Sequence, residues 1–355
     1  MVLVSRNLLM RFLFLLNLFL TSFFNKSLKA TVVLFLIVAT VLVFPPQVKS
    51  YGYSENNSAD LGLQHAGPVY DLGGGGRDVD EAIQWMINEV RGCYSCEKKV
   101  DVVIIRNSGS DAYNEAILAM DGVSSAKTLI ISDREEATRE NVVEDIEDAE
   151  VIFFAGGDQC QYLRNYLNTG VDGAIKSVIA RGGAVGGTSA GAMIQSDFVF
   201  NACSDTVISE TALESPYEDI TLNQDFFYWD NLQDTIIDTH FYERDRMGRL
   251  MTFVARLLRD GRASDALGIG VDENTSLIVD QNGLAEVVGV RDGFVYFVSG
   301  DHLPEKCEPQ TPLTFSRFKI WKRGNGETFD LRNRALNDDY YEVSVENGKI
   351  DSNPY

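Results

Sequence analysis

The feature that most constrains the fold of this chain is a series of short, unbroken apolar runs separated by amphipathic stretches of helix length. Unbroken apolar strands that alternate with helices are typical of a parallel sheet covered by helices on both faces. We therefore expect an α/β fold with a mostly parallel sheet, and functional side chains at the carboxyl ends of its strands. The runs lie at residues 67–72, 100–105, 128–131, 151–154, 184–185, 235–237 and 268–271.

Beyond about residue 280 the pattern changes to short alternating strands, at 285–290 and 295–299. This alternation predicts an antiparallel extension of the sheet near the C-terminus. The chain shows no internal repeat and no low-complexity linker. We therefore expect one domain over residues 67–322, preceded by a polar linker at 51–66 and followed by a C-terminal extension at 323–355.

The first fifty residues contain two apolar runs, at 8–24 and 31–44, and then a Pro-Pro pair. This arrangement predicts a signal peptide cleaved after Ser50, with a membrane anchor over residues 1–50 as the alternative. The triplets that begin at Asn56 and Asn274 match the glycosylation pattern. The chain is therefore expected to be a secreted, extracellular or lumenal glycoprotein.

The formal net charge of −21 argues against a nucleic-acid partner, because a polyanion is repelled by such a field. The same field attracts a cationic small molecule or an Arg-rich peptide, although an ordinary soluble surface is the better explanation of the charge. The chain has five cysteines, so one thiol stays unpaired within a monomer. Cys93 and Cys96 form the only close pair, which favours a disulfide over zinc, with buried free thiols as the alternative.

A G-x-S-x-G pattern at residues 187–191 follows a short apolar strand. A serine at such a strand-to-helix elbow is exposed on a tight turn, and the small flanking residues let neighbouring backbone pass close by. We therefore predict Ser189 as a nucleophile, with the Ala190 N–H in its oxyanion hole and the following helix directed at it. The alternative is a phosphate-binding or merely tight turn in which the hydroxyl caps the helix.

A nucleophilic serine needs a base, and the chain has only three histidines. His65 lies in the polar segment before the first strand, and His302 lies among the later antiparallel strands. His240 ends an apolar run, at the carboxyl end of a predicted strand, and is therefore the best candidate. The acid that orients it is either Asp272 or Glu273, because adjacent residues on an extended chain point to opposite faces.

Two further segments contain candidate binding residues. Arg244, Arg246 and Arg249 crowd the start of an amphipathic helix, where one or more could bind a substrate carboxylate; the alternative is a surface network of acids and arginines. A glycine turn after the strand at 151–154 could supply the Gly157 N–H as a second oxyanion donor, with Gln159 reaching the substrate. The run at 73–76 lacks the context of a dinucleotide site.

Four blocks of this sequence, in order, resemble the cyanophycinase and dipeptidase E group of serine peptidases, the S51 type. The blocks lie at 153–159, 186–192, 238–249 and 268–273, and the resemblance covers roughly residues 68–300. It implies a fold related to the glutamine amidotransferases and flavodoxin, and a Ser-His-Glu triad with Glu273 as the acid. It also places Asp238 among the substrate-binding residues.

The resemblance further implies hydrolysis of peptide bonds next to aspartate, with no metal and no cofactor. The expected substrate is a small peptide or cyanophycin, from which cyanophycinases release β-Asp-Arg dipeptides. The chain has Thr239 where bacterial cyanophycinases commonly have glutamine, which bears on the substrate pocket. The competing hypotheses are an esterase of the α/β-hydrolase type with His302 as base, and a non-catalytic peptide-binding protein. A homodimer is an open alternative to a monomer.

Overall fold

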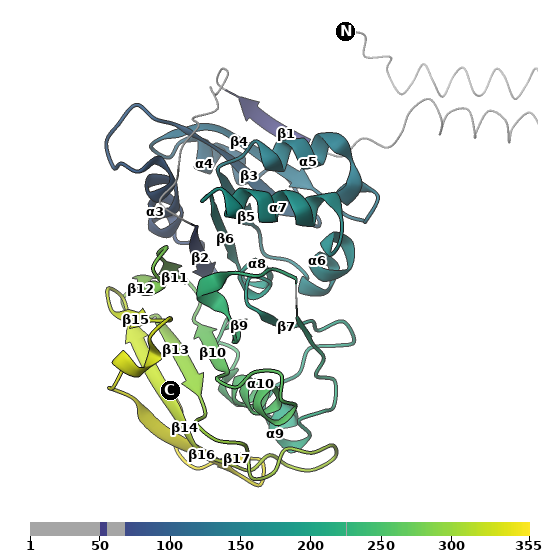
Figure 1. The fold of residues 1–355 in the computed structure, drawn as a ribbon, viewed down its shortest axis with the longest axis vertical. Helices are drawn as coiled ribbons and strands as arrows, with labels where there is room; N and C mark the ends of the chain where they lie inside the picture. The colour runs from purple at the N-terminus through teal and green to yellow at the C-terminus, as the bar shows by residue number, and fades with distance from the viewer. Residues whose placement is uncertain (1–49, 55–67, 225) are drawn as a thin grey trace, which may run out of the picture. The chain divides into compact units, whose positions relative to one another are not determined.

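In the computed structural model, the described residues are 50–54, 68–224 and 226–355 (Figure 1). The predicted signal peptide or anchor, the triplet at Asn56 and His65 lie outside these residues. Within the described ranges, no helix is both long and apolar enough to cross a bilayer. The described residues all belong to one unit, Lys49–Tyr355.

The first sheet has nine strands and contains the predicted parallel core. Five neighbouring strands in the order β4-β3-β5-β6-β2 run parallel, and β11, β12 and β15 extend the sheet antiparallel beyond β2. β1 pairs antiparallel with β4 at the other edge, within the segment expected to be a linker. The strands are β1 (Ser50–Ser54), β2 (Val69–Gly73), β3 (Val100–Arg106), β4 (Val123–Ile130), β5 (Val151–Phe154), β6 (Ala184–Thr188), β11 (Thr275–Val279), β12 (Leu284–Gly289) and β15 (Thr328–Asp330).

A second sheet has eight strands in the order β17-β16-β14-β13-β10-β9-β7-β8. β10, β9 and β7 are parallel, and the remaining pairs are antiparallel. The strands are β7 (Phe198–Phe200), β8 (Leu222–Gln224), β9 (Thr235–Thr239), β10 (Leu267–Val271), β13 (Phe294–Ser299), β14 (Phe315–Gly324), β16 (Tyr341–Glu346) and β17 (Lys349–Ile350). The α/β class is confirmed, but the predicted single sheet is divided, since apolar periodicity identifies strands and does not identify their partners.

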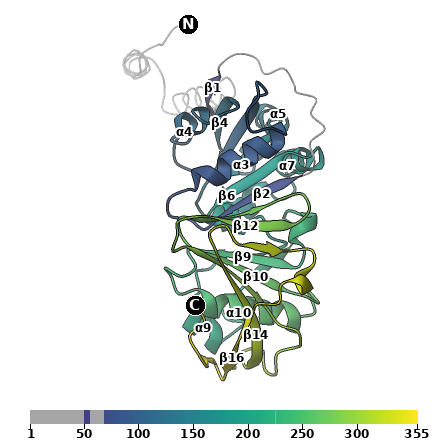
Figure 2. The same cartoon turned by 90° about the vertical axis from the view of Figure 1, so that its left-hand side faces the viewer.

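Helices pack on both sheets. α5 and α7 lie side by side over the first sheet, and α10 lies on β10 and β13 of the second (Figures 1 and 2). The close approach of α10 is possible because Gly268 has no side chain; a Cβ there would lie 2.8 Å from Leu250 Cγ. The helices are α3 (Asp80–Arg91), α4 (Asn114–Leu118), α5 (Glu140–Glu147), α6 (Gln159–Tyr166), α7 (Gly170–Ala180), α8 (Ala190–Met193), α9 (Ser209–Glu214) and α10 (Met247–Arg259), with 3-10 turns at Glu136–Thr138, Asp230–Leu232 and Arg334–Leu336.

The residues expected to form a C-terminal extension are part of this architecture. The boundary expected after residue 322 falls inside β14, and β15 to β17 add strands to both sheets. Val343 and Val345 are buried in the core that also contains the apolar face of α10. The segment therefore closes one edge of the second sheet.

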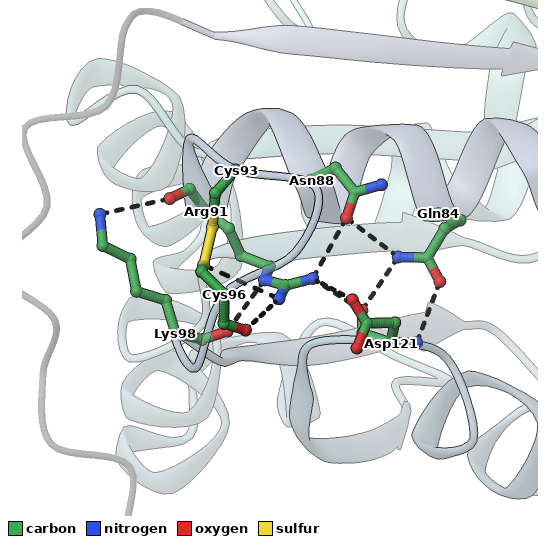
Figure 3. Close-up of a disulfide and its surroundings, with 7 residues drawn as sticks. All are labelled: Gln84, Asn88, Arg91, Cys93, Cys96, Lys98 and Asp121. Carbon is green, nitrogen blue, oxygen red and sulfur yellow. Dashed lines mark hydrogen bonds and ion pairs between the residues drawn. A yellow bond between two sulfur atoms is a disulfide. The ribbon is translucent and has the colours of Figure 1, made fainter.

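Two disulfides are present, Cys93–Cys96 and Cys160–Cys203, and Cys307 is a buried free thiol. The close pair predicted from the sequence is therefore bonded. Beside it, the fully buried Arg91 side chain holds the disulfide loop (Figure 3). Its guanidinium donates to the carbonyl oxygen of Cys96 at 2.8 Å and to a carboxylate oxygen of Asp121 at 2.8 Å.

Candidate active site

Three predicted residues meet where the ends of three strands converge. Ser189 follows β6, His240 follows β9 and Glu273 lies two residues after β10. The Ser189 Oγ lies 2.8 Å from His240 Nε2, and His240 Nδ1 lies 2.5 Å from Glu273 Oε1. A hydroxyl, an imidazole and a carboxylate in this order form the hydrogen-bonded relay that activates a serine for acyl transfer.

The choice between the two neighbouring acids is resolved by the direction of their side chains. Asp272 is buried and turned away from His240, where it accepts hydrogen bonds from the N–H groups of Tyr242 and Phe294, both at 3.0 Å. Glu273 faces His240, and its own N–H donates to Glu243 at 3.1 Å. This agrees with the alternation of an extended chain.

Ser189 and His240 both have a backbone conformation that is rare for residues with a side chain. Their φ angles are 55° and 49°. Such positions cost roughly 1–3 kcal/mol each and persist only where the surroundings enforce them. At Ser189 the strained elbow lets the hydroxyl project from the end of β6 towards His240. The helix expected after it, α8, is a single turn, because the chain soon joins the second sheet at β7.

The backbone of the glycine run at 73–76 contacts both Ser189 and His240, a role that was not predicted from the sequence. Gly73 accepts a hydrogen bond from the Ser189 N–H at 2.9 Å, and Gly74 accepts one from the His240 N–H at 2.7 Å. Gly75 has a φ of 97°, and a Cβ on it would lie 2.3 Å from His240 Cε1. The signal was available in the sequence, since consecutive glycines directly after a buried strand indicate close backbone approach.

The expected oxyanion donors lie on two turns beside Ser189. A Cβ on Gly156 would be 3.5 Å from Ser189 Cβ, which places the 156–157 peptide next to the nucleophile. Within the described residues, neither the Gly157 N–H nor the Ala190 N–H donates to another protein group. Both donors are therefore available to a developing negative charge.

The His240 imidazole is biased towards its neutral form. Burial lowers its pKa below the ordinary 6.5, the hydrogen bond to Glu273 opposes that shift, and the positive charges of Arg244 and Arg246 lower the pKa further. A neutral imidazole is the form that can accept the serine proton.

The three arginines near His240 have different surroundings. Arg249 is 2% exposed and forms a two-point ion pair with Asp238, which is 0% exposed. Direct substrate contact by these two residues is therefore a wrong expectation, because each is the ion-pair partner of the other inside the core.

Arg246 and Arg244 lie nearer the surface. Arg246 donates to Asp238 at 3.2 Å and to the Thr239 carbonyl at 2.7 Å. Burial lowers its pKa to about 10. Arg244 is exposed, and within the described residues its side chain has no ion-pair partner.

The remaining candidates are placed as follows. Gln159 is half-buried at the start of α6, where its side-chain amide lies 3.4 Å from the Phe200 carbonyl. The Thr239 side chain is fully buried, and its hydroxyl has no partner among the residues that the structure describes, so it does not line the surface beside His240. The side-chain oxygen of Asn274, an expected glycan acceptor, accepts a hydrogen bond from the Arg77 N–H at 2.8 Å.

His302 does not contact Ser189. Its two ring nitrogens lie 2.8 Å from Asp301 Oδ1 and 3.3 Å from Ser316 Oγ, on the second sheet. The esterase hypothesis, which needs His302 as the base, is therefore contradicted by the geometry.

Comparison with known proteins identifies the family of this chain. The sequence model of Peptidase family S51 matches residues 111–288. A cyanophycinase from Nostoc sp. is 28% identical over 221 residues, which cover 61% of this chain and 68% of that protein. A cyanophycinase from Geminocystis herdmanii is 26% identical over 216 residues, covering 59% of this chain and 73% of that protein.

A solved structure supports the fold. The crystal structure of a peptidase from an acI-B1 Actinobacterium aligns with a TM-score of 0.52 at 20% identity, and covers 75% of this chain and 98% of that one. The family match spans half of the chain and includes Ser189, His240 and Glu273. The chain therefore belongs to peptidase family S51 and is a serine-type peptidase.

Proposed function

We propose that this peptidase hydrolyses cyanophycin or related aspartyl peptides to β-Asp-Arg-type dipeptides, with Ser189, His240 and Glu273 as its catalytic triad. The observation that carries the proposal is the unbroken hydrogen-bond chain from the Ser189 hydroxyl through His240 to Glu273. The substrate class is supported by the relatives, which are named cyanophycinases.

In the proposed mechanism, His240 Nε2 takes the proton of Ser189 as Oγ attacks the scissile carbonyl carbon. Glu273 holds the ring through Nδ1 and stabilises the imidazolium that forms. The Gly157 and Ala190 N–H groups stabilise the oxyanion, a contribution typically of about 3–4 kcal/mol for one donor. His240 then protonates the leaving amine, and water hydrolyses the acyl-enzyme by the same route.

Substrate carboxylates are proposed to bind Arg244 and Arg246. Arg244 is exposed and has no ion-pair partner among residues 50–54, 68–224 and 226–355, and Arg246 is held in place by Asp238, which is itself held by Arg249. Guanidinium groups bind carboxylates through paired hydrogen bonds, so two of them beside His240 favour an acidic substrate. In this proposal Asp238 and Arg249 act indirectly, by positioning Arg246.

We also propose that the protein is exported to an oxidising compartment. The Cys160–Cys203 disulfide supports this, since such bonds persist mainly in secreted and lumenal proteins. N-terminal sequencing of the native protein tests it: a mature end near Tyr51 agrees with cleavage, and a soluble form that keeps Met1 contradicts it.

The test of the catalytic proposal is to incubate the purified protein with cyanophycin, with β-Asp-Arg-containing peptides and with ordinary Asp-X dipeptides. We expect release of β-Asp-Arg, and its loss by at least about a thousandfold in Ser189→Ala, because the covalent step disappears. Ser264→Ala, an exposed serine outside the site, is the matched control and is expected to keep full activity. Equal activity in Ser189→Ala and the wild type would disprove the assigned nucleophile.

A further inference from the structure

Tyr355 contacts the loop that carries the two substrate-facing arginines, although it lies more than a hundred residues away in sequence. Its hydroxyl accepts a hydrogen bond from the Met247 N–H at 3.0 Å and donates one to Asp245 Oδ1 at 2.9 Å. Its ring packs edge-to-face on Tyr242, with the ring centroids 5.2 Å apart. One side chain therefore touches both ends of the segment between His240 and α10.

This segment, residues 241–246, ends at a point where the backbone leaves a donor without a partner inside the helix. Met247 begins α10, and the first N–H groups of a helix have no partner inside the helix. Arg246 precedes it and provides no side-chain cap. Asp245 has a φ of 47°, a rare conformation for a residue with a side chain. The Tyr355 hydroxyl supplies the missing acceptor and holds the Asp245 side chain at the same time.

The other side of the segment is tied to the catalytic residues. The Tyr242 N–H donates to Asp272, and Glu243 accepts a hydrogen bond from the Glu273 N–H. The Arg246 side chain donates to the Thr239 carbonyl at 2.7 Å, and the Arg244 N–H donates to the His240 carbonyl at 3.2 Å, so both arginines are tied to the backbone at His240. The segment is thus held between the end of β10 on one side and Tyr355 on the other.

Tyr355 is itself held in place. The Tyr341 hydroxyl, at the start of β16, donates to the Pro354 carbonyl at 2.8 Å, and the Tyr355 N–H donates to the Asn353 side chain at 3.2 Å. The ring also lies edge-to-face against Tyr296 of β13, at 5.6 Å between centroids. The second sheet therefore fixes the tyrosine before it contacts the arginine segment.

We propose that Tyr355 is a positioning residue that sets the affinity of the enzyme for substrate carboxylates, acting through residues 241–246. This inference rests on the proposed function of Arg244 and Arg246. It goes beyond that function because it makes substrate recognition depend on the last strands of the second sheet, which lie outside the matched family segment.

The test is Tyr355→Phe, which keeps the ring contacts and removes both hydrogen bonds. Two hydrogen bonds of roughly 0.7 kcal/mol each correspond to a change of about tenfold in KM. We expect that rise in KM for a β-aspartyl peptide with a free carboxylate, with kcat within about twofold of the wild type. A carboxamide version of the peptide should bind the two enzymes almost equally. Tyr217→Phe removes a similar Tyr–Asp hydrogen bond, to Asp260 directly after α10, and is the control expected to change neither constant.

A role that is only structural would lower kcat for both peptides, and that result would overturn the proposal. An unchanged KM for the carboxylate peptide in Tyr355→Phe would also overturn it. If the wild type hydrolyses neither peptide, the proposed function fails separately. The carboxylate peptide is then titrated into Ser189→Ala with and without Tyr355→Phe; weaker binding of about tenfold in the double variant supports the positioning role, and equal binding refutes it.

Discussion

At the scale of single residues, the site depends on glycines as well as on residues with reactive side chains. Gly73, Gly74 and Gly75 bring three carbonyl oxygens against the backbone of Ser189, His240 and Asn274. A Cβ at Gly75 would overlap the His240 ring. Four glycines in a row weaken a chain by their conformational freedom, and the close approach of this segment to Ser189 and His240 explains their presence here.

Arg244 is expected to influence both the substrate affinity and the pH dependence of the reaction. Burial lowers the pKa of His240, and the Arg244 charge lowers it further. Only the neutral imidazole is active as a base, so kcat/KM rises as the pH passes upward through this pKa. Arg244→Gln removes a positive charge, which raises the pKa of His240 and moves the acidic limb of the profile to higher pH.

The profile of kcat/KM against pH measures this effect, and KM for a carboxylate substrate should rise about fivefold or more, as expected for the loss of about 1 kcal/mol. Arg317→Gln removes an exposed arginine on the second sheet and is the control. An acidic limb that stays in place in Arg244→Gln, or moves to lower pH, would show that Arg244 does not act on His240.

At the scale of elements, two disulfides hold two different parts of the chain. Cys160 lies in α6, directly after the turn that contains Gly157, and Cys203 follows β7. The bond joins helix and strand ends 43 residues apart, and Ser189 lies within the closed segment. Cys93–Cys96 closes a separation of only three residues, and there the buried Arg91 holds the loop by hydrogen bonds (Figure 3).

Loop length predicts how much each bond stabilises the fold. In the chain-entropy view, replacing Cys160 and Cys203 by alanine lowers the free energy of unfolding by about 4 kcal/mol, and replacing Cys93 and Cys96 lowers it by only about 2 kcal/mol. Urea unfolding of the two double variants measures the difference. The first variant should also lose kcat, because the turn beside the nucleophile is less constrained. Equal losses of stability would contradict the loop-length argument.

At the scale of the whole molecule, buried carboxyl groups make stability depend on pH. Asp71 lies in β2 next to the glycine loop and is 2% exposed, and one of its carboxylate oxygens has no partner in the described part of the chain. Burial raises its pKa to about 7. The pKa values of Glu150 and Asp272 are also raised by burial, to about 7 and about 6. The folded state therefore holds protons that the unfolded state loses at lower pH.

The sign of the effect follows from the linkage between proton binding and folding. Between about pH 4 and pH 7 the folded state binds more protons than the unfolded state, so the free energy of unfolding falls as the pH rises. Asp71→Asn removes one of these groups, and its stability should fall less steeply over that range. Urea unfolding at pH 4.5, 6 and 8 measures the slope, with Asp133→Asn, an exposed carboxylate, as the control. A wild type that becomes more stable from pH 5 to 8 would contradict the prediction.

The sequence by itself determined the fold class, the family and the residues of the candidate triad. These follow from local information: buried strands appear as unbroken apolar runs, and chemically necessary residues follow them at the strand ends. Ser189 and His240 could be singled out because an elbow serine and one of only three histidines each end such a run. The Asp272–Glu273 alternation was also visible, although the family resemblance was needed to choose Glu273.

Only the tertiary structure decided what depends on contacts between distant segments. It divided the strands into two sheets, paired Asp238 with Arg249 inside the core, and placed Gly75 against His240. It also brought Tyr355 to the arginine segment. Packing among residues far apart in the chain sets the strand partners, the buried ion pairs and the close backbone contacts. A pattern confined to a few neighbouring residues therefore cannot predict them.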